Sequence, residues 1–436
     1  MNLRSTNTNS LNGEIICPGD KSISQRILIL GSLLNCNMEI SGFLDANDPN
    51  STLNALNDIG ASIKKSGSKV ILCRRKSPFI NPSQNLNLGN SGTGMRLMIG
   101  LISGLGINAI LVGDSSLSKR PMSRVIKPLK EMGAKIQSNE GKSPIEIIES
   151  NISSEFEYKM PIASAQVKSS LILASLASNN SITIIEPKIT RDHTERMIKF
   201  FGGSVTHSSD VSGLIRVGNN KLTSKNYYEI VGDFSSAAFV IVATLISKKS
   251  KVVIKNVGLN PSRSGLLEIL ALMGANIEIR NQKITCNEES GDIFVKSSSL
   301  NGIEVPEDII PNIIDEIPIL SIAAAFAKGT TSIKNASELR VKESDRLEAI
   351  SDGLKKLNIK HETFEDGISI TGTNDLIVAE EEINSFDDHR IAMSFLVAGI
   401  RSANNIKVKD CKNIETSFPG FKDIMNSIGM KIDEQN

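Results

Sequence analysis

Residues that can bind anions or move protons stand at the start of several strongly apolar segments. In PGDKSISQR, Lys21 comes just before the turn, and Ser22 and Arg26 lie four residues apart, on one face of a predicted helix. A helix start has unpaired amides and a partial positive charge, so it favours anions. The same residues also fit a helix cap followed by a surface arginine, and the motif alone leaves both interpretations open.

Two further apolar segments open on small and polar residues. In LGNSGTGMR, a glycine-rich turn around Asn90 and Gly92 suits close approach of the backbone to a phosphate, with Arg96 nearby. Arg120, in SKRPM, is the next basic residue, and an exposed loop would explain it equally well. A third helix start supplies neutral hydrogen-bonding groups, for which simple capping is the alternative, at Ser164, Ala165 and Gln166.

The second half of the chain adds acidic groups to this arrangement. Asp315 and Glu316 precede the apolar run IPILSIAAAFA, so they are either helix-start charges or candidates for a general base. His389 and Arg390 lead directly into IAMSFLVAGI, where a solvated surface is hard to arrange. Arg191, in TRDHTER, fits a capping segment or a binding loop. The charge run ELRVKESDR would usually be solvated, but it joins a strand to a helix, so some charges must turn inward or meet a ligand.

Six almost wholly apolar helices are predicted to position these groups. A helix that is apolar on nearly every side must be buried. Most of the candidate residues therefore lie at the N-terminal ends of buried helices, and such ends facing one site would bind a heavily anionic substrate pair. The predicted helices start at Ser22, Ser91, Ser164, Ser235, Asp315 and Asp388.

A second, amphipathic helix recurs with the same period and ends before a short strand. A helix commonly ends with a left-handed residue, for which glycine is best suited and asparagine is the usual substitute. Repetition at a fixed period predicts six units of one buried helix, one surface helix and strands. The end residues are spaced by 73, 69, 72, 84 and 71 positions, at Gly60, Gly133, Gly202, Gly274, Asn358 and Gly429.

The two halves of the chain also correspond. PGDKS, around Gly19, is echoed by VGDFS, around Gly232, 213 residues later, which equals three units. A chain of 436 residues also exceeds one ordinary core. We therefore predict an α/β protein in which residues 1–19 and 233–436 form a discontinuous domain and residues 20–232 form an inserted one.

Bulk composition excludes several classes of protein. Hydrophobic residues make up 40% and charged residues 22%, which is typical of a globular chain, and the formal charge is only 49 − 48 = +1. That balance argues against a surface for nucleic acid, which requires many phosphate contacts. No apolar run approaches the ~20 residues that cross a bilayer, and no signal core is present. Five scattered cysteines suit a reducing compartment, so we expect a cytoplasmic protein.

Seven of these motifs, in order, resemble the 5-enolpyruvylshikimate-3-phosphate (EPSP) synthase family. The resemblance runs from about Gly13 to Gly420, and SAQVKSS and TRDHTER are similar to the subclass called class II. It implies a two-domain inverse β/α prism, with three βαβαββ units per domain, six in all, and an active site in the interdomain cleft. The motifs are PGDKSISQR, LGNSGTGMR, GDSSLSKRPM, SAQVKSS, GDFSSAAF, ELRVKESDR and DDHRIAMSF.

The resemblance implies an enzyme of the shikimate pathway, which leads to chorismate and the aromatic amino acids. The enzyme would transfer the 1-carboxyvinyl (enolpyruvyl) group of phosphoenolpyruvate to the 5-hydroxyl of shikimate 3-phosphate. The transfer would proceed by addition, followed by elimination of phosphate. The family requires no metal or organic cofactor, and we expect a monomer that acts on small molecules, without nucleic acid or membrane partners.

The family's functional residues carry over by motif. Asp315 would take the hydroxyl proton and Glu343 would protonate C3, with Lys21 assisting; such tasks suit groups whose pKa values are tuned by a crowded site. Arginines would hold carboxylate and phosphate groups by forked hydrogen bonds. Shikimate 3-phosphate would contact Lys21, Ser22, Arg26, Ser164, Ala165, Gln166, Arg191, Asp315 and Lys342. Phosphoenolpyruvate would contact Lys21, Asn90, Gly92, Arg96, Arg120, Gln166, Arg346, His389 and Arg390.

Two alternatives compete with this hypothesis. The UDP-N-acetylglucosamine enolpyruvyl transferases resemble the same fold, but they carry a catalytic cysteine where this chain has Ser115, and the KESDR run is foreign to them. A non-catalytic module that binds anions is the alternative from a different class. Candidates for every catalytic role, at Lys21, Asp315 and Glu343, count against it.

We predict that activity survives strong chelation. The sequence has four histidines and no set of ligands with metal spacing, so it offers no evident metal site. Phosphate release should be unchanged after dialysis against EDTA, with a known zinc enzyme treated in parallel as the control. Activity that is lost in EDTA and restored by zinc or magnesium would contradict the prediction.

Overall fold

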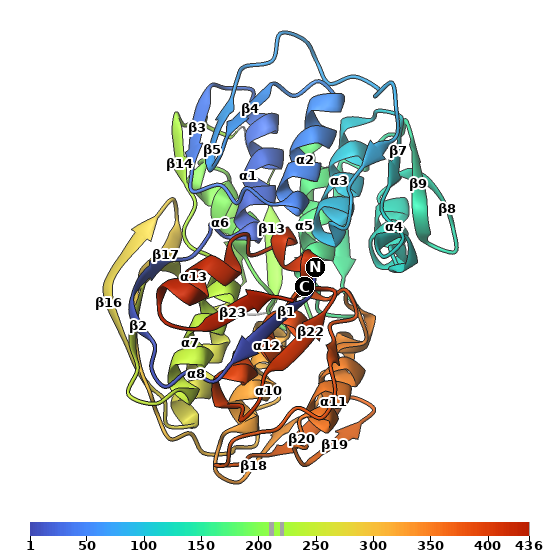
Figure 1. The fold of residues 1–436 in the computed structure, drawn as a ribbon. Coiled ribbons are helices and arrows are strands. Elements are labelled where there is room, and N and C mark those ends of the chain that lie inside the picture. Colours follow the sequence, from blue (N-terminus) through green and yellow to red (C-terminus); the bar gives the residue numbers. More distant parts are fainter. Residues whose placement is uncertain (209–212, 219–221, 436) are drawn as a thin grey trace. The chain divides into compact units, whose positions relative to one another are not determined.

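The computed structural model describes residues 1–208, 213–218 and 222–435, and its internal contacts divide the chain into two compact units (Figure 1). The first unit comprises Met1–Pro18, Val231–Lys283 and Glu289–Asn436. The second unit comprises Gly19–Ile230 and Ile284–Glu288. The chain changes unit after Pro18 and after Ile230.

The short segment Ile284–Glu288 was not predicted to belong with the second unit. It comprises the turn between β16 (Asn276–Thr285) and β17 (Glu288–Lys296) and the adjoining strand ends; most of both strands lie in the first unit, but the side chains of this segment have partners in the second. Glu288 Oε1 lies 2.8 Å from His193 Nδ1, and both side chains are buried. The Asn287 amide donates to the Arg196 carbonyl over 2.9 Å. These partners are remote in sequence, so the predicted boundary could not include them.

In the second unit, three buried helices and three outer helices are combined with sheets. The buried helices are α1 (Lys21–Leu34), α3 (Gly92–Leu105) and α5 (Ala165–Ala177), and the outer ones are α2 (Asn47–Asp58), α4 (Ser123–Glu131) and α6 (His193–Phe200). The strand orders are β14-β3-β5-β4, β6-β7-β9-β8 and β10-β11-β13-β12. The strands are β3 (Met38–Ser41), β4 (Ile63–Ser66), β5 (Lys69–Leu72), β6 (Leu86–Asn87), β7 (Ala109–Val112), β8 (Lys135–Asn139), β9 (Lys142–Ile148), β10 (Glu155–Lys159), β11 (Ser181–Ile185), β12 (Val205–His207), β13 (Leu214–Val217) and β14 (Tyr227–Glu229).

The first unit repeats this plan. Its buried helices are α7 (Phe234–Ile246), α10 (Ile317–Ala325) and α12 (His389–Ala398), accompanied by α8 (Gly265–Leu272), α9 (Ile310–Ile313), α11 (Arg346–Lys356) and α13 (Phe421–Ser427). The strand orders are β21-β22-β1-β23, β16-β17-β15-β2 and β18-β20-β19. The strands are β1 (Leu3–Thr6), β2 (Asn12–Ile16), β15 (Lys251–Gly258), β16 (Asn276–Thr285), β17 (Glu288–Lys296), β18 (Thr330–Ile333), β19 (His361–Phe364), β20 (Gly367–Thr371), β21 (Ile383–Asn384), β22 (Ile406–Lys409) and β23 (Lys431–Glu434).

A parallel pair of strands followed by an antiparallel hairpin is the common plan of the sheets. β6 and β7 are parallel and are joined through the buried helix α3, because parallel strands require a long connection. The plan changes where the chain changes unit. β2 precedes α1 but pairs with β15, and β14 precedes α7 but pairs with β3. Each of these strands therefore completes a sheet of the unit that the chain is about to leave.

The N-terminal strand completes the last repeat. β1 pairs antiparallel with both β22 and β23, which places Leu3 opposite Val408 on one side and Glu434 on the other (Figure 1). The two ends of the chain therefore lie side by side in one sheet of the first unit. The sixth repeat is closed by residues from the beginning of the sequence.

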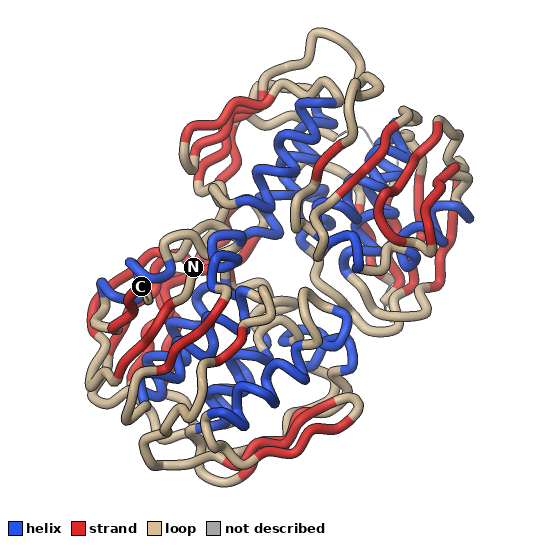
Figure 2. Tube along the Cα trace, turned by 45° about the vertical axis from the view of Figure 1, so that its right-hand side comes forward, coloured by secondary structure: helices blue, strands red, loops and turns tan. Residues whose placement is uncertain are grey.

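The predicted period and the buried helices are confirmed. All 13 residues of α7, 9 of α10 and 10 of α12 are buried, and Figure 2 shows strands outside the helices of each unit. Helix starts differ from prediction by at most two residues, as expected for helix ends. The six end residues all have positive φ, between 56° at Asn358 and 107° at Gly429, which is the left-handed conformation that the repeat required.

Packing between α11 and α12 predicts a destabilising substitution in the first unit. A Cβ atom added at Gly353 would lie 2.0 Å from Cζ of the buried Phe395. Alanine gains about 1 kcal/mol over glycine in a helix, but overpacking costs about 1–3 kcal/mol, so the clash should prevail. Urea unfolding of Gly353→Ala should show a lower free energy of unfolding than the wild type.

Lys355→Ala, at an exposed position of the same helix, is the matched control and should change stability little. A Gly353→Ala protein more stable than the wild type would contradict the packing described for Phe395.

Candidate active site

The starts of α1, α3 and α5 are linked to one another in the second unit. The Gln25 amide of α1 donates to Ser91 Oγ, the cap of α3, over 2.5 Å. The Gln166 amide of α5 donates to Thr93 Oγ1 of α3 over 2.9 Å. Because each helix start carries a partial positive charge, the gathered starts form a region that favours anions.

Lys21 is the first residue of α1, because the helix begins one residue earlier than the predicted start at Ser22. Its Nζ lies 3.2 Å from Asp48 Oδ2, on α2. Both side chains are mostly buried, and the Asp20 carboxylate caps the helix by accepting from the Ile23 amide over 2.9 Å. The Lys21 amine is therefore held at the N-terminal end of α1 by the Asp48 carboxylate, which the motifs did not identify.

Arg26 is buried among neutral partners. Its Nε donates to Thr194 Oγ1 over 2.9 Å, Nη2 to Ser169 Oγ over 3.2 Å, and Nη1 to the Ser22 carbonyl over 3.1 Å. Burial lowers the pKa of Arg26 to about 10, and repulsion from Arg191 acts in the same direction against attraction by nearby carboxylates. The side chain stays protonated at neutral pH, and its direct hydrogen bonds go to hydroxyl and carbonyl groups.

The predicted phosphoenolpyruvate residues of the second unit lie together. Arg120 Nη2 donates to Asn90 Oδ1 over 2.6 Å, and Arg96 donates to Gln166 Oε1. A Cβ atom on Gly92 would be 3.1 Å from Arg120 Nη1 and 3.5 Å from Arg96 Nη1. Glycine is needed here because two guanidinium groups approach its backbone. Ser164 caps α5, and Ala165 is the first residue of that helix.

In the first unit, the starts of α7, α10 and α12 are joined through Arg390. Its Nη1 donates to the Asp315 carbonyl over 2.7 Å and lies 3.3 Å from Glu316 Oε1. Its Nη2 donates to Ser235 Oγ, on α7, over 3.0 Å. His389, which precedes Arg390 in the sequence, is the first residue of α12, and its side chain is buried. The arginine thus connects three helix starts.

The Asp315 carboxylate has three cationic neighbours in this unit. Its carboxylate oxygens lie 3.3 Å from Arg346 Nη1, 3.5 Å from Lys342 Nζ and 3.6 Å from Arg263 Nη1. The side chain is 16% exposed, so it can still meet a ligand. Three cations favour the charged form of this carboxylate.

Arg346 is engaged by carboxylates. Its side chain is 1% exposed, and it lies 2.7 Å from Asp388 Oδ2 and 2.6 Å from Glu343 Oε2. Desolvation lowers the pKa of Arg346, but attraction by Asp388, Glu343 and Asp315 outweighs it, so the pKa is raised. A substrate anion that binds Arg346 must therefore compete with Glu343 and Asp388.

The motifs missed two residues with direct contacts to these groups. Asp48 pairs with Lys21, and Arg263 contacts Asp315 from the segment before α8. The repeat did contain a signal for the second. Arg191 lies two residues before the outer helix α6, and Arg263 lies two residues before the outer helix of the next repeat, α8. The candidate arginine before α6 therefore pointed to the matching position before α8.

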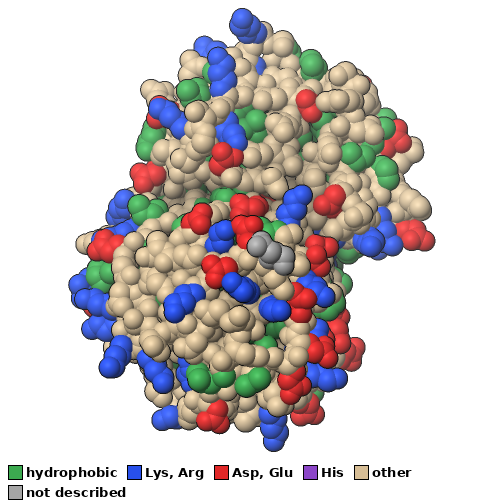
Figure 3. Space-filling model, in the orientation of Figure 1, with side chains coloured by type: hydrophobic (Ala, Val, Ile, Leu, Met, Phe, Trp, Pro, Cys, Tyr) green, Lys and Arg blue, Asp and Glu red, His purple; other side chains and the backbone are tan. Residues whose placement is uncertain are grey.

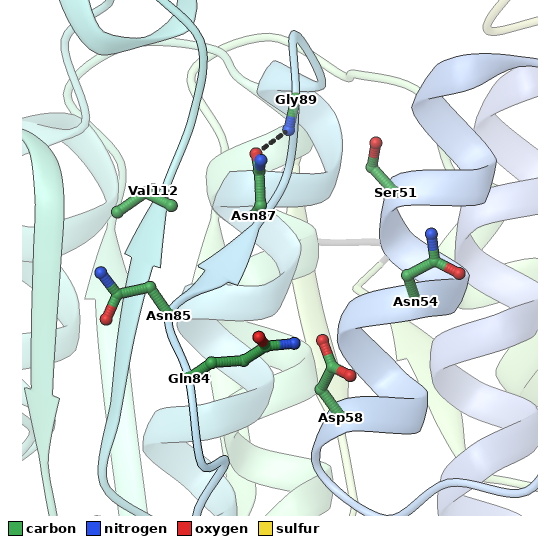
Figure 4. Close-up of a pocket in the computed structure, with 8 residues that line it drawn as sticks. All are labelled: Ser51, Asn54, Asp58, Gln84, Asn85, Asn87, Gly89 and Val112. Carbon is green, nitrogen blue, oxygen red and sulfur yellow. Dashed lines mark hydrogen bonds between the residues drawn. The ribbon is translucent and has the colours of Figure 1, made fainter.

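The hollow drawn in Figure 4 is lined by none of the cations described above for the second unit. Its volume is about 540 Å³, and none of the residues lining it is basic. An anionic substrate requires cations, so we place the candidate site at the helix starts. The lining residues are Ser51, Asn54, Asp58, Gln84, Asn85, Asn87, Gly89 and Val112.

The surface shown in Figure 3 has no large region of one charge, so anion binding must come from local groups of basic residues. On the face shown in Figure 3, basic and acidic side chains are interspersed. Within residues 1–208, 213–218 and 222–435, no group of three or more His, Cys, Asp or Glu could hold a metal ion. Nor does any helix in that part of the chain have the length and apolarity to cross a membrane. A metal-independent reaction stays a prediction.

Comparisons with known proteins agree over nearly the whole chain. The EPSP synthase (3-phosphoshikimate 1-carboxyvinyltransferase) family matches residues 5–425. A 3-phosphoshikimate 1-carboxyvinyltransferase of Petrotoga mobilis is 47% identical over 432 residues, 98% of this chain and 99% of the relative. One from Coxiella burnetii is 42% identical over 435 residues, 99% and 98% of the two chains. The solved EPSP synthase from Acinetobacter baumannii is 39% identical and has a TM-score of 0.86, with 100% of both chains covered.

The fold and the clusters define an α/β protein that gathers cations and carboxylates at the starts of buried helices. The chain belongs to the EPSP synthase family. It is an enzyme of the shikimate pathway, and it transfers the enolpyruvyl group of phosphoenolpyruvate to shikimate 3-phosphate. The family, the fold class and the reaction predicted from the sequence are confirmed.

Lys21→Met is predicted to abolish nearly all turnover while preserving the fold. Removing a positioned acid–base group costs about 10²–10⁴-fold in rate. Because the Lys21–Asp48 pair is mostly buried, the loss of one partner should also lower the melting temperature, by about 2–4 °C for each kcal/mol of stability lost, while the enzyme stays folded at the assay temperature. Steady-state phosphate release and thermal unfolding measure the two effects.

Lys69→Met is the matched control, because Lys69 also pairs with a carboxylate, Glu39, at 2.8 Å, but on an exposed strand. It should keep wild-type turnover. A Lys21→Met enzyme with a tenth or more of wild-type activity would rule out the role given to Lys21.

Proposed function

We propose that Lys21, Asp315 and Glu343 are the catalytic residues of this transfer and that the two units act on the same pair of substrates. The observation that carries the proposal is the environment of Asp315: a partly exposed carboxylate with three cationic neighbours, at the start of a buried helix. The same cations that keep the carboxylate charged would attract the substrate's phosphate and carboxylate groups.

In the addition step, Asp315 would accept the proton of the 5-hydroxyl while that oxygen attacks C2 of the enolpyruvyl group. A charged carboxylate is an acceptor only, so it can take a hydrogen bond from the hydroxyl before it takes the proton. The short link from its backbone carbonyl to Arg390, 2.7 Å, would fix the base relative to a cation assigned to phosphoenolpyruvate. Base and electrophile would thereby be held in one arrangement.

C3 of the enolpyruvyl group gains a proton in the same step, and Glu343 is the proposed donor, with Lys21 assisting. The hydrogen bond from Arg346 over 2.6 Å favours the charged form of Glu343, which cannot donate. A substrate anion that takes Arg346 would weaken this pair and so favour protonation of Glu343. Binding of the substrate would therefore prepare its own proton donor. In the elimination step, C3 would give a proton back to Glu343 while the bond between C2 and the phosphate oxygen breaks. The phosphate would leave with the electron pair of that bond and take up the proton that Asp315 accepted from the hydroxyl.

The second unit would supply most of the anion binding. Arg26, Arg96 and Arg120 donate hydrogen bonds to hydroxyl and amide groups at these helix starts, and as cations with forked donors they are suited to bind phosphate and carboxylate groups. The proposed contacts to shikimate 3-phosphate here are Lys21, Ser22, Arg26, Ser164, Ala165, Gln166 and Arg191, and those to phosphoenolpyruvate are Lys21, Asn90, Gly92, Arg96, Arg120 and Gln166. In the first unit, Asp315 and Lys342 would contact the former, and Arg346, His389 and Arg390 the latter.

We also propose that the protein works as a cytoplasmic monomer. Every role named above is filled by residues of one chain, so the mechanism requires no second copy. Light scattering coupled to gel filtration at assay concentration should give the mass of one chain, 47.1 kDa. A stable dimer would contradict the proposal.

Phosphate release from phosphoenolpyruvate should require shikimate 3-phosphate. The hydroxyl of the acceptor starts the addition, so without it no tetrahedral intermediate forms and no phosphate is lost. Omission of the acceptor, and its replacement by UDP-N-acetylglucosamine, are the two controls. Release with the nucleotide sugar but not with shikimate 3-phosphate, or release without any acceptor, would overturn the assignment.

A further inference from the structure

Arg263 is a buried cation beside the proposed base that no motif identified. It lies before α8, and its side chain is 4% exposed. Its Nη1 is 3.6 Å from Asp315 Oδ2, and its Nη2 donates to Ser235 Oγ over 2.6 Å. It also lies 3.5 Å from Asp233 Oδ1. A guanidinium can contact several groups at once because its donors form a rigid fork.

Ser235 and Glu316 tie Arg263 to Arg390. Ser235 Oγ accepts from both arginines, over 2.6 Å from Arg263 and 3.0 Å from Arg390, and donates to Glu316 Oε1. The Glu316 side chain is 0% exposed and lies 3.7 Å from Arg263 Nη1 and 3.3 Å from Arg390 Nη1. Two guanidinium groups that would repel each other are thus held around one carboxylate oxygen and one hydroxyl.

The charge around Asp315 would change in a defined way without Arg263. An opposite charge within about 4–6 Å favours the ionised carboxylate. Loss of Arg263 would remove one of the three cations that contact Asp315, while four further acids stay close by. The charged groups that face Asp315 or its contacts are Arg263, Lys342, Arg346, Arg390, Asp233, Glu316, Glu343 and Asp388.

We propose that Arg263 is a positioning residue for the transfer: it keeps the Asp315 carboxylate charged and in place and, through Ser235 and Glu316, fixes the direction of Arg390. The inference rests on the proposed role of Asp315 as the base. Arg263 need not touch either substrate. Its effect would be transmitted by the 3.6 Å contact to Asp315 and by the shared Ser235 hydroxyl.

The test is the pH dependence of kcat for Arg263→Gln. Activity requires the charged base, so it falls as the pH drops through the pKa of that base. A neutral residue at position 263 should raise this pKa and move the acidic limb upward by about one pH unit. Lost positioning should lower kcat at the optimum by about 10²-fold.

Arg263→Lys separates charge from geometry. Lysine keeps the charge but lacks the fork, so the acidic limb should stay within 0.3 units of the wild type, while kcat falls by about tenfold because Ser235 and Asp315 cannot both be contacted. Arg280→Gln is the matched control. Arg280 pairs with Glu278 at 2.6 Å on an exposed strand of the same unit, and its profile should match the wild type.

The outcomes distinguish the inference from the function on which it rests. A folded Arg263→Gln enzyme with a reduced kcat and an unmoved limb would show a structural role only and would overturn the inference. If the glutamine variant does not fold, the lysine variant decides: a displaced limb, or a wild-type kcat, overturns it. If Asp315→Asn keeps wild-type activity and its acidic limb, the proposed base is wrong, whatever position 263 shows.

Discussion

The constraint on which the rest of the structure depends is the burial of six apolar helices whose first turns must stay polar. A buried helix end exposes amides that require acceptors, and its partial charge attracts anions. Side chains cap five of the six helices, from Asp20, Ser91, Ser164, Asp233 and Asp388, and α10 has no side-chain cap. The sheets and outer helices enclose the helix bodies, and the helix starts are where charge can gather.

The two units meet this constraint with different chemistry. In the second unit, Arg26, Arg96 and Arg120 donate hydrogen bonds to hydroxyl, amide and carbonyl groups. In the first unit, Arg263 and Arg346 face carboxylates that neutralise much of their charge. Arginines that donate to neutral groups are suited to hold anions, whereas carboxylates among cations are suited to exchange protons.

A buried ion cluster lies in the second unit, beside the segment that carries Arg191. Lys168 Nζ lies 2.7 Å from Glu195 and 2.9 Å from Glu186, and it donates to the Thr190 carbonyl over 3.3 Å. Desolvation lowers the pKa of Lys168, but the two carboxylates outweigh it and the pKa is raised. Because removing one partner of such a cluster leaves an uncompensated charge, the cluster fixes the segment that carries Arg191.

The sequence by itself determined the repeat, the buried helices and most of the candidate residues, because these follow from local rules. Hydrophobic period predicts which helices are buried, and a left-handed end residue predicts glycine or asparagine at the six ends. The motif series also determined the family and the reaction. The predicted start of the first buried helix was wrong by only one residue, because Asp20 caps α1 and the helix begins at Lys21.

Tertiary structure alone decided which residues surround each functional group. Asp48 reaches Lys21 from α2, Arg263 reaches Asp315 across 52 positions of the chain (315 − 263), and Glu288 reaches His193 from the turn of a hairpin. The pairing of β2 with β15, and the closure of the last sheet by β1, likewise join strands that are remote in sequence. No local rule contains these partners, because each contact arises only when separate helix starts and strands pack together.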